Sequence, residues 1–255
     1  VRASPSTGGV RASFASLGVV IVAEPRALLR CAGPRVAEQM LGAQLPEGSD
    51  RAESLLAHGM IDKIVDRPRL RDLLSVLLEL LSSRQRLAGV TRDGRREPRE
   101  LQDRTTEKPN AWKTVQLARH GQRPTSLDYI GRIMSTFVEL HGDRLYGDDP
   151  AIVGGLADLN GLAVVVIGQE RGHGETAAAH NEGRARPEGY RKALRLMDLA
   201  AKFKLPLITL IDTPGAYPGL ESEQRGLASS LAHCLARMSV LPTPVLAAVI
   251  GDGGS

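Results

Sequence analysis

Aromatic side chains are scarce in this chain, because only 3% of its 255 residues are Phe, Trp or Tyr. Single-stranded nucleic acids are usually bound on aromatic stacking platforms, so this composition argues against such a site. The two cysteines, Cys31 and Cys234, are too few and too far apart for a disulfide framework or a zinc cluster. No apolar run is long enough to cross a membrane, and the first residues lack the apolar core of a signal peptide. We therefore expect a cytoplasmic protein with no membrane partner.

The common catalytic motifs are also missing. The sequence has no G-x-S-x-G elbow, no H-E-x-x-H pair, no phosphate-binding G-x-x-x-x-G-K loop and no C-x-x-C pair. His173 and His180 share a polar stretch, where a solvated pair is favoured over a metal pair. His233 and Cys234 are adjacent on a predicted helix and point in different directions, so we expect no Cys–His dyad.

The net charge of +4 is concentrated in one segment. Residues 84–110 carry eight basic and five acidic side chains and so contribute +3 of that total. A segment of mixed sign with few apolar residues is typical of a solvated linker, whereas a nucleic-acid site needs a basic stripe on a folded face. We therefore predict two units, residues 1–83 and 111–255, joined by a linker over 84–110, and no nucleic-acid partner.

Hydrophobic periodicity predicts alternating helices and strands in both units. In the first unit we predict helices over 10–17, 35–41, 51–58 and 68–81 and strands over 19–23 and 61–65. In the second unit we predict helices over 112–120, 126–140, 187–204 and 222–238 and strands over 152–159, 162–167, 207–211 and 245–250. Asn160-Gly161 indicates a hairpin between the first two of these strands. The strand–helix–strand order that follows predicts an α/β fold with parallel strands.

Three glycine-rich segments are the candidate functional sites. Gly8-Gly9 precede a predicted helix, Gly253-Gly254 follow the last predicted strand, and Asp212–Gly219 follow the buried strand 207–211. Glycine lets backbone N–H groups approach a ligand closely, and two such groups can hold an oxygen that becomes negatively charged. Taken alone, each segment is also explained by a tight turn, and that interpretation stays open.

Several longer stretches resemble a known family. The α subunit of bacterial acetyl-CoA carboxylase carboxyltransferase is similar over 187–197, 212–219 and 250–255, and over the shorter stretches 117–120, 140–144 and 151–155. The end of the β subunit is similar over 7–10, 12–15, 23–25, 32–36 and 58–62. The chain thus resembles the junction of a fused β–α polypeptide, cut at both ends.

The resemblance implies a crotonase-like fold of repeated ββα units, present here as two partial halves joined by a linker. Members of this family move a carboxyl group from carboxybiotin, held on a biotin carboxyl carrier protein, to acetyl-CoA. The product is malonyl-CoA for fatty acid biosynthesis. The implied partners are the carrier protein and biotin carboxylase, and the implied assembly is a homo-oligomer. Zinc is implied only in a ribbon upstream of residue 1. Because the transfer needs donors to oxyanions, the absence of a nucleophile is consistent with it.

The resemblance also assigns roles to residues. Gly8 and Gly9 match the pair of backbone amides in the β half, and Gly215, Ala216 and Tyr217 match a substrate-binding loop. Gly253 and Gly254 match the start of the family's Gly-Gly-Ser-Gly-Gly run, whose second pair lies beyond Ser255. Residues 172–183 contain no Lys or Arg, where the family carries several basic residues. A propionyl-CoA or other acyl-CoA carboxyltransferase and a non-catalytic scaffold remain alternatives.

The predicted linker can be tested by limited proteolysis. Residues 84–110 hold thirteen charged side chains together with Pro98 and Pro109 and show no apolar stripe. We expect the first cut in this segment and two fragments that stay associated on size-exclusion chromatography. A first cut inside 112–140 would contradict the boundary.

Overall fold

The computed structural model describes residues 6–7, 16–30, 38–39, 42–44, 46–82 and 110–254. Its first unit contains two small parallel sheets. Strand β1 (Ser6–Thr7) pairs with β3 (Leu29–Arg30), and β2 (Val22–Ala23) pairs with β4 (Lys63–Ile64). The strands predicted over 19–23 and 61–65 are therefore present but short. The helices predicted over 10–17 and 35–41, and the linker apart from Asn110, lie largely outside the described residues.

Two helices complete the described part of the first unit. Helix α2 (Ala52–Ala57) is followed by Gly59, whose φ of +68° is the left-handed conformation that glycine adopts readily. Helix α3 (Arg67–Leu81) confirms the helix predicted over 68–81 and has proline in its first turn. Leu77 and Leu80 are buried against the core of the second unit, whereas Leu78 is 66% exposed. One hydrophobic cluster thus includes residues of both units, whereas Ile21, Leu29 and Ile61 belong to a separate cluster within the first unit.

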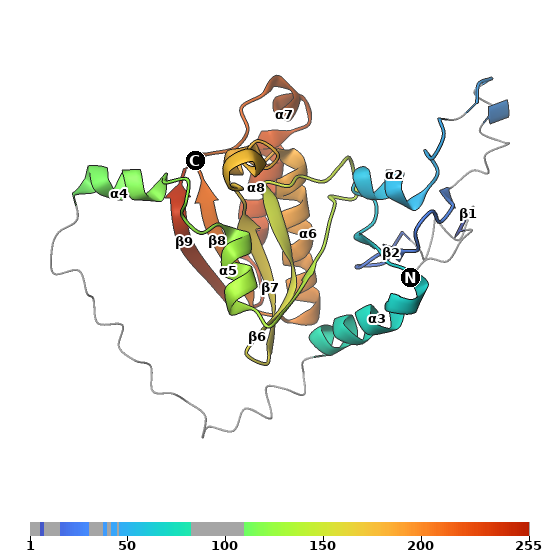
Figure 1. Ribbon diagram of the computed structural model, residues 1–255, viewed down its shortest axis with the longest axis horizontal. Helices are drawn as coiled ribbons and strands as arrows, with labels where there is room; N and C mark the ends of the chain where they lie inside the picture. Colours follow the sequence, from blue (N-terminus) through green and yellow to red (C-terminus); the bar gives the residue numbers. More distant parts are fainter. Residues whose placement is uncertain are drawn as a thin grey trace.

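A five-stranded sheet forms the centre of the second unit (Figure 1). Its strands lie in the order of the chain: β5 (Thr136–Glu139), β6 (Ile152–Leu159), β7 (Leu162–Gln169), β8 (Leu207–Thr213) and β9 (Val245–Gly253). The first three strands are antiparallel and the last three are parallel. Asn160 and Gly161 both have positive φ at the β6–β7 turn, so the predicted hairpin is confirmed. The parallel strands end at one edge of the sheet.

The helix predicted over 126–140 is wrong in its second half. Helix α5 (Ser126–Ile133) ends where Met134 adopts an extended conformation, and β5 follows. Thr136, Phe137 and Val138 are residue types that favour strands, and pairing with β6 satisfies their backbone groups. Thr125 is the N-cap residue of α5, and its N–H donates to the Asp128 carboxylate at 2.9 Å.

Helices cover both faces of the sheet. Helix α6 (Pro187–Phe203) packs on one face together with α8 (Leu227–Ser239), and α5 packs on the other face. The helix predicted over 222–238 is interrupted, because Gly226 has a φ of +80° and separates α8 from the short α7 (Leu220–Gln224). Helix α4 (Ala111–Ala118) makes its main contact with the edge strand β9. It projects from the body of the molecule (Figure 1).

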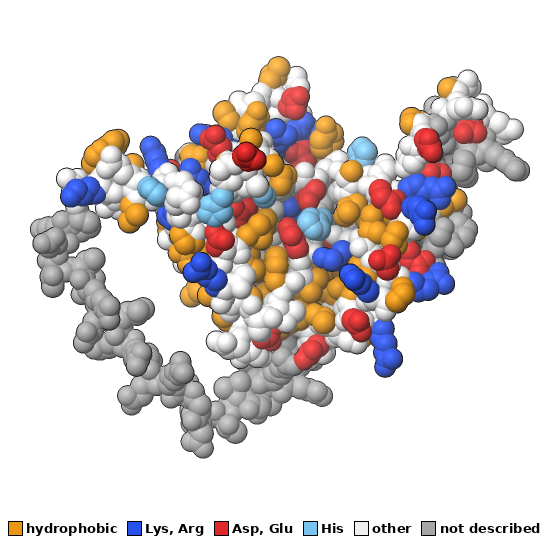
Figure 2. Space-filling view, in the orientation of Figure 1, with side chains coloured by type: hydrophobic (Ala, Val, Ile, Leu, Met, Phe, Trp, Pro, Cys, Tyr) orange, Lys and Arg blue, Asp and Glu red, His pale blue; other side chains and the backbone are white. Residues whose placement is uncertain are grey.

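The surface of the described residues carries both signs of charge. Basic and acidic side chains are interspersed over the face shown in Figure 2. Within the described ranges, no helix combines the length and hydrophobicity that a membrane span requires.

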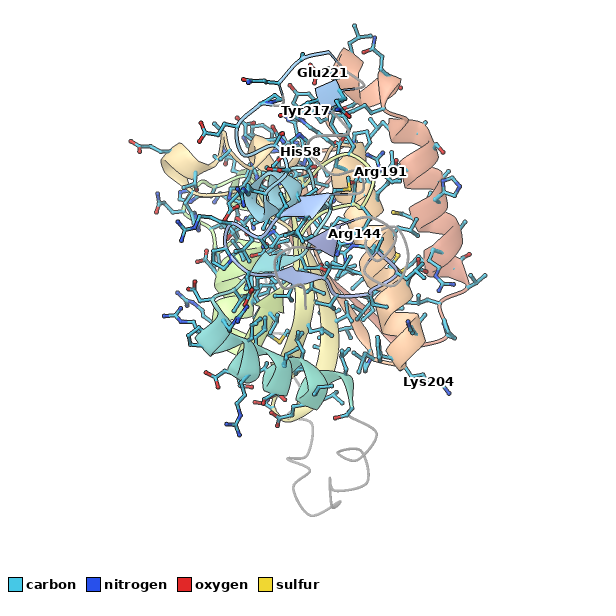
Figure 3. The ribbon with its side chains drawn as sticks, turned by 90° about the vertical axis from the view of Figure 1, so that its right-hand side faces the viewer. His58, Arg144, Arg191, Lys204, Tyr217 and Glu221 are labelled. Atoms are coloured by element: carbon cyan, nitrogen blue, oxygen red, sulfur yellow. The ribbon has the colours of Figure 1, made fainter. Side chains whose placement is uncertain are left out.

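A buried carboxylate joins the two units. Asp62 is fully buried and forms ion pairs with Arg144 and, at 3.0 Å, with Arg195 of α6. Arg144 is labelled in Figure 3, and its backbone N–H also donates to the carbonyl of Gly59. At this contact Gly142 lies so close to Gly59 that a Cβ on Gly142 would overlap the Gly59 backbone. Only glycine at residue 142 permits this approach of the two chain segments.

The close approach predicts a difference between two glycine substitutions. Gly142 and Gly161 have similar positive φ values, +80° and +86°, but nothing lies within 4 Å of a Cβ built on Gly161. Gly161→Ala should cost about 1–2 kcal/mol through the left-handed backbone alone. Gly142→Ala should cost about 1–3 kcal/mol more, because the added methyl group overpacks the junction. Urea denaturation of both variants measures this difference, and equal losses would show that the two units do not meet at Gly142.

Candidate functional site

The predicted loop over 212–219 begins where β8 ends, at the edge of the sheet where open α/β folds bind ligands. Thr213 is buried, and its hydroxyl organises the loop. The Thr213 Oγ1 donates to the carbonyl of Gly183 at 2.5 Å and accepts the N–H of Gly215 at 3.0 Å. Gly215 has a φ of +137°, so the chain turns there in a conformation that other residues rarely adopt.

Gly253 and Gly254 lie beside this loop. Gly253 is paired with Thr213 as the last residue of β9, which therefore runs beyond the predicted end at residue 250. The Gly254 N–H donates to the carbonyl of Thr213 at 2.7 Å, and a Cβ on Gly254 would overlap the carbonyl group of Pro214. The structure thus brings together two glycine-rich segments that are far apart in the sequence.

The backbone N–H groups at the start of the loop differ in whether they have a partner. The N–H of Gly215 is bound by Thr213, and the N–H of Tyr217 donates to the carbonyl of Ala185 at 2.9 Å. Within the described residues, the N–H of Ala216 between them has no hydrogen-bond acceptor. Because backbone N–H groups in folded proteins are nearly always paired with protein or water, this one can donate to a ligand oxygen.

Tyr217 is held by stacking rather than by its hydroxyl group. The Arg186 guanidinium lies over its ring, 4.7 Å from the ring centroid. Figure 3 shows Tyr217 and Glu221 at the opposite end of the molecule from Lys204, the left-handed residue that closes α6. The loop therefore lies at the end of the sheet where α6 begins.

A buried ion pair lies beneath the loop. Asp212 is fully buried and accepts the Arg123 guanidinium at 2.7 Å. Its own N–H donates to the side chain of Gln169 at the end of β7, at 3.0 Å. A cavity of about 300 Å³ opens beside this pair and is also lined by Arg171 and Glu182. Asp212 thus connects the end of β8 to the end of β7 through its backbone N–H and to Arg123 through its carboxylate.

Residues 171–186 fold over the same edge. Glu170 is buried and accepts the N–H groups of Leu127 and Gly172, at 2.8 and 2.7 Å. Asn181, Glu182 and Gly183 all have positive φ, an uncommon run that stores backbone strain. The hydroxyl of Thr213 keeps this turn in place through the Gly183 carbonyl.

The histidines of this region form no metal site in the described residues. His173 Nε2 lies 2.6 Å from the Asp128 carboxylate, whereas His180 Nδ1 contacts the carbonyl of Pro150. The prediction of a solvated pair is therefore incomplete, because each imidazole ring contacts a different protein group.

His233 and Cys234 form no dyad. His233 Nδ1 contacts the Ser229 carbonyl one helical turn earlier, and the Cys234 thiol donates to the Tyr190 carbonyl. Burial raises the pKa of Cys234 to about 11, so the nucleophilic thiolate is disfavoured. This thiol lines an apolar cavity of about 330 Å³ between α6, α8 and the sheet, whose wall also includes Thr213 and Gly254.

The remaining predicted site residues, Gly8 and Gly9, lie outside the described residues. Sequence reasoning marked the loop 212–219 as a unit but did not distinguish the free N–H of Ala216 from its engaged neighbours. It also missed Arg123, whose side chain is only 12% exposed. The available signal was weak, since an arginine before a proline and a helix cap is ordinary at a protein surface.

Comparison with known proteins gives one consistent family. The family model described as "Acetyl co-enzyme A carboxylase carboxyltransferase-like" matches residues 82–255. The chain is 46% identical over 259 residues to the acetyl-coenzyme A carboxylase carboxyl transferase subunits beta/alpha of Salinispora tropica, covering 100% of this chain and 46% of that protein. The same-named protein of Clostridium tetani is also 46% identical, with 100% of this chain and 44% of the relative covered. The chain thus spans about half the length of these relatives.

Solved structures support the fold. The hexameric transcarboxylase 12S, crystallised with methylmalonyl-coenzyme A and methylmalonic acid, matches with a TM-score of 0.71 at 20% identity. That match covers 97% of this chain and 46% of the other. A single-chain, multi-domain long-chain acyl-CoA carboxylase matches with a TM-score of 0.68 at 20% identity, covering 95% and 22%. These likenesses confirm the predicted crotonase-like α/β fold class.

The pair of His173 and Asp128 predicts a pH dependence. Their hydrogen bond raises the pKa of His173 and lowers the pKa of Asp128. The His173 contribution to stability should be complete below its unfolded pKa of about 6.5 and lost as pH rises through the folded value. The Asp128 contribution should be present above its ordinary pKa and lost as pH falls through the lowered one. Both side chains are about two-fifths exposed, so we expect at most about 1 kcal/mol.

Proton NMR titration of the His173 ring tests this pair. Asp128→Asn should bring the pKa of His173 back towards its ordinary value. An unchanged titration in that variant would show that the carboxylate does not contact the imidazole in solution.

Proposed function

The chain belongs to the acetyl-CoA carboxylase carboxyltransferase family. We therefore propose that it is part of an enzyme that transfers a carboxyl group from carboxybiotin to acetyl-CoA. The product is malonyl-CoA, the carboxylated building block for fatty acid biosynthesis. The family match and the fold support this reaction class. Because the chain spans about half the length of its relatives, the activity is assigned to the whole carboxyltransferase.

The unengaged N–H of Ala216 is the observation that supports this chemistry most directly. It lies between two engaged N–H groups, beyond the carboxyl end of a buried parallel strand. A fixed backbone donor at such a position can stabilise an oxygen on which negative charge develops during the reaction. Gly215, which directly precedes Ala216, carries no Cβ and leaves the backbone open to close approach.

The residues present suit a biotin-linked donor and a thioester acceptor. Bound carboxybiotin supplies the carboxyl group. The part of this chain is to hold charge, because the Ala216 N–H donates to a substrate oxygen that becomes anionic. Gly8 and Gly9 are proposed as the corresponding amide pair of the first unit. Losing one such donor typically costs about 10²–10³ in rate, which indicates the size of each contribution.

The arrangement of the two units favours a site made by two copies of the chain. Ser6–Thr7, which directly precede Gly8, lie on the far side of the molecule from the end of β9 (Figure 1). A substrate held by both glycine pairs would then lie between the first unit of one copy and the second unit of another. We therefore propose a homo-oligomer in the cytoplasm, served by a biotin carboxyl carrier protein and biotin carboxylase.

The proposed function is tested with the full-length fused enzyme and with Gly9→Val. Wild type should transfer the carboxyl group of malonyl-CoA to free biotin, and acetyl-CoA should be the preferred acceptor in the forward direction. Gly9→Val should lower kcat by about 10² or more, because a β-branched side chain blocks the seat of the oxygen. The KM for acyl-CoA and the melting temperature should change little, because the contact strengthens only in the transition state.

Gly131→Val is the matched control, because Gly131 is an exposed residue of α5 with nothing within 4 Å of a built Cβ. It should keep wild-type kinetics. Preference for propionyl-CoA would change the substrate assignment, and acyl-CoA binding without turnover would reduce the protein to a scaffold. Full activity in a well-folded Gly9→Val variant would remove the role of the Gly8-Gly9 pair.

A further inference from the structure

The side chain of Arg123, a residue in the connection between α4 and α5, contacts several separate parts of the chain. It follows α4, yet its guanidinium reaches under the sheet edge. Its Nε donates to the carbonyl of Ala118 at 2.9 Å, and its Nη1 donates to the carbonyls of Pro124 and Ile250, at 3.2 and 2.8 Å. Its Nη2 donates to Asp212 at 2.7 Å. One planar group thus binds the connection, β8 and β9 together.

The contacts of this pair fall where the ladder between β8 and β9 is irregular. Ile211 is paired with Val249, but Thr213 is paired with Gly253, so two steps along β8 correspond to four along β9. The extra residues of β9 form a bulge. Bulges of this kind disrupt the ladder and re-aim the strand, and they are common next to active sites.

The two side chains satisfy backbone groups that the bulge removes from the ladder. Arg123 binds the carbonyl of Ile250, and the second carboxylate oxygen of Asp212 accepts the N–H of Asp252 at 3.0 Å. Gly251 lies between these two residues, and a Cβ on it would overlap both the Arg123 guanidinium and the Asp212 carboxylate. The ion pair therefore lies directly against the backbone of the bulge.

The bulge fixes the place of the next two residues. Gly253 and Gly254 follow it at once, and the Gly254 N–H closes onto Thr213, whose hydroxyl holds the loop containing Ala216. We propose that Arg123, acting through Asp212 and the β9 bulge, is a positioning residue for the glycine-rich substrate loops at this edge. This inference rests on the proposed function for its kinetic effect, but the bulge itself can be examined without activity.

A neighbouring ion pair provides the matched control. Arg119 pairs with the side chain of Asp252 in the same bulge at 2.9 Å, but its own side chain is 61% exposed and it touches no backbone group of β9 in the described contacts. An exposed pair of this kind contributes little. Arg119→Lys should therefore resemble wild type in every measurement below.

Arg123→Lys is the central variant. It keeps the positive charge beside Asp212, so the fold should persist, but an ammonium group cannot reproduce the planar fork that binds both Ile250 and Asp212. In the full-length enzyme we expect kcat to fall by about 10–100-fold with the KM for acyl-CoA within about threefold, because misplacing a reacting group by about 1 Å costs up to about 10²-fold. Hydrogen exchange measured by mass spectrometry should rise in peptides covering 250–254 and stay unchanged in those covering 152–167.

Rescue with a small molecule separates positioning from general stability. Arg123→Ala removes the fork and leaves space continuous with the cavity beside Asp212. Guanidinium at millimolar concentration should then raise the kcat of this variant at least about tenfold and return hydrogen exchange at 250–254 towards the wild-type level. Equal concentrations of urea should do neither. If Arg123→Ala does not fold, Arg123→Lys and its exchange pattern decide the question.

The possible outcomes separate the two proposals. An inactive wild type with increased exchange at 250–254 in Arg123→Lys would overturn the proposed function and leave the bulge assignment standing. An active wild type whose Arg123→Lys variant keeps its kcat and its exchange would overturn the positioning role. A parallel loss of kcat, acyl-CoA affinity and melting temperature, with exchange raised throughout the sheet, would also overturn it.

Discussion

The carboxyl edge of the sheet depends on one buried carboxylate. Asp212 is shielded from water, so its charge must be matched by protein groups, and these come from three directions. Arg123 and, at 3.6 Å, Arg171 supply the opposite charge, and the Asp252 N–H donates to the carboxylate. The backbone N–H of Asp212 separately donates to Gln169 at the end of β7. Breaking a buried pair of this kind typically costs about 3–5 kcal/mol. The ends of β7, β8 and β9 are therefore held in one arrangement, which also fixes where the loops after them begin.

The same device joins the two units. Asp62 of the first unit is fully buried between Arg144 and Arg195 of the second, and it also accepts the N–H of Ile21 at 2.6 Å. The hydrophobic contact made by α3 is not directional, because apolar burial depends on area. The charged contact is directional and fixes how the units meet. Together they explain how a small first unit with two-residue strands keeps a defined place on the larger one.

Local signals in the sequence predicted the elements whose ends are set locally. The hairpin at Asn160-Gly161 and helix α6 need no distant partner to be recognised, and both are confirmed. The helix predicted over 126–140 failed because its apolar residues are compatible with either period, and pairing with β6 decided between them. The same distinction between local and distant signals applies to the candidate site. The glycine-rich loop was visible as a motif, but the free N–H of Ala216 depends on Thr213 and on Ala185, and Arg123 is 89 residues away from its carboxylate partner.

Among the described residues, the junction between the units is held by packing and charge, since Gly59 meets Gly142 and Asp62 meets Arg144 without a covalent bond. Two separate polypeptides with these surfaces could form the same contact, so the covalent connection through residues 83–109 adds something other than affinity at the interface. It makes the encounter intramolecular, with an effective concentration that is about millimolar for short linkers. It also fixes the stoichiometry of the two units at one to one, because each translation event produces one copy of both. A cell that makes this chain has no need to balance the expression of two genes, and neither unit is left with its share of the junction exposed to solvent.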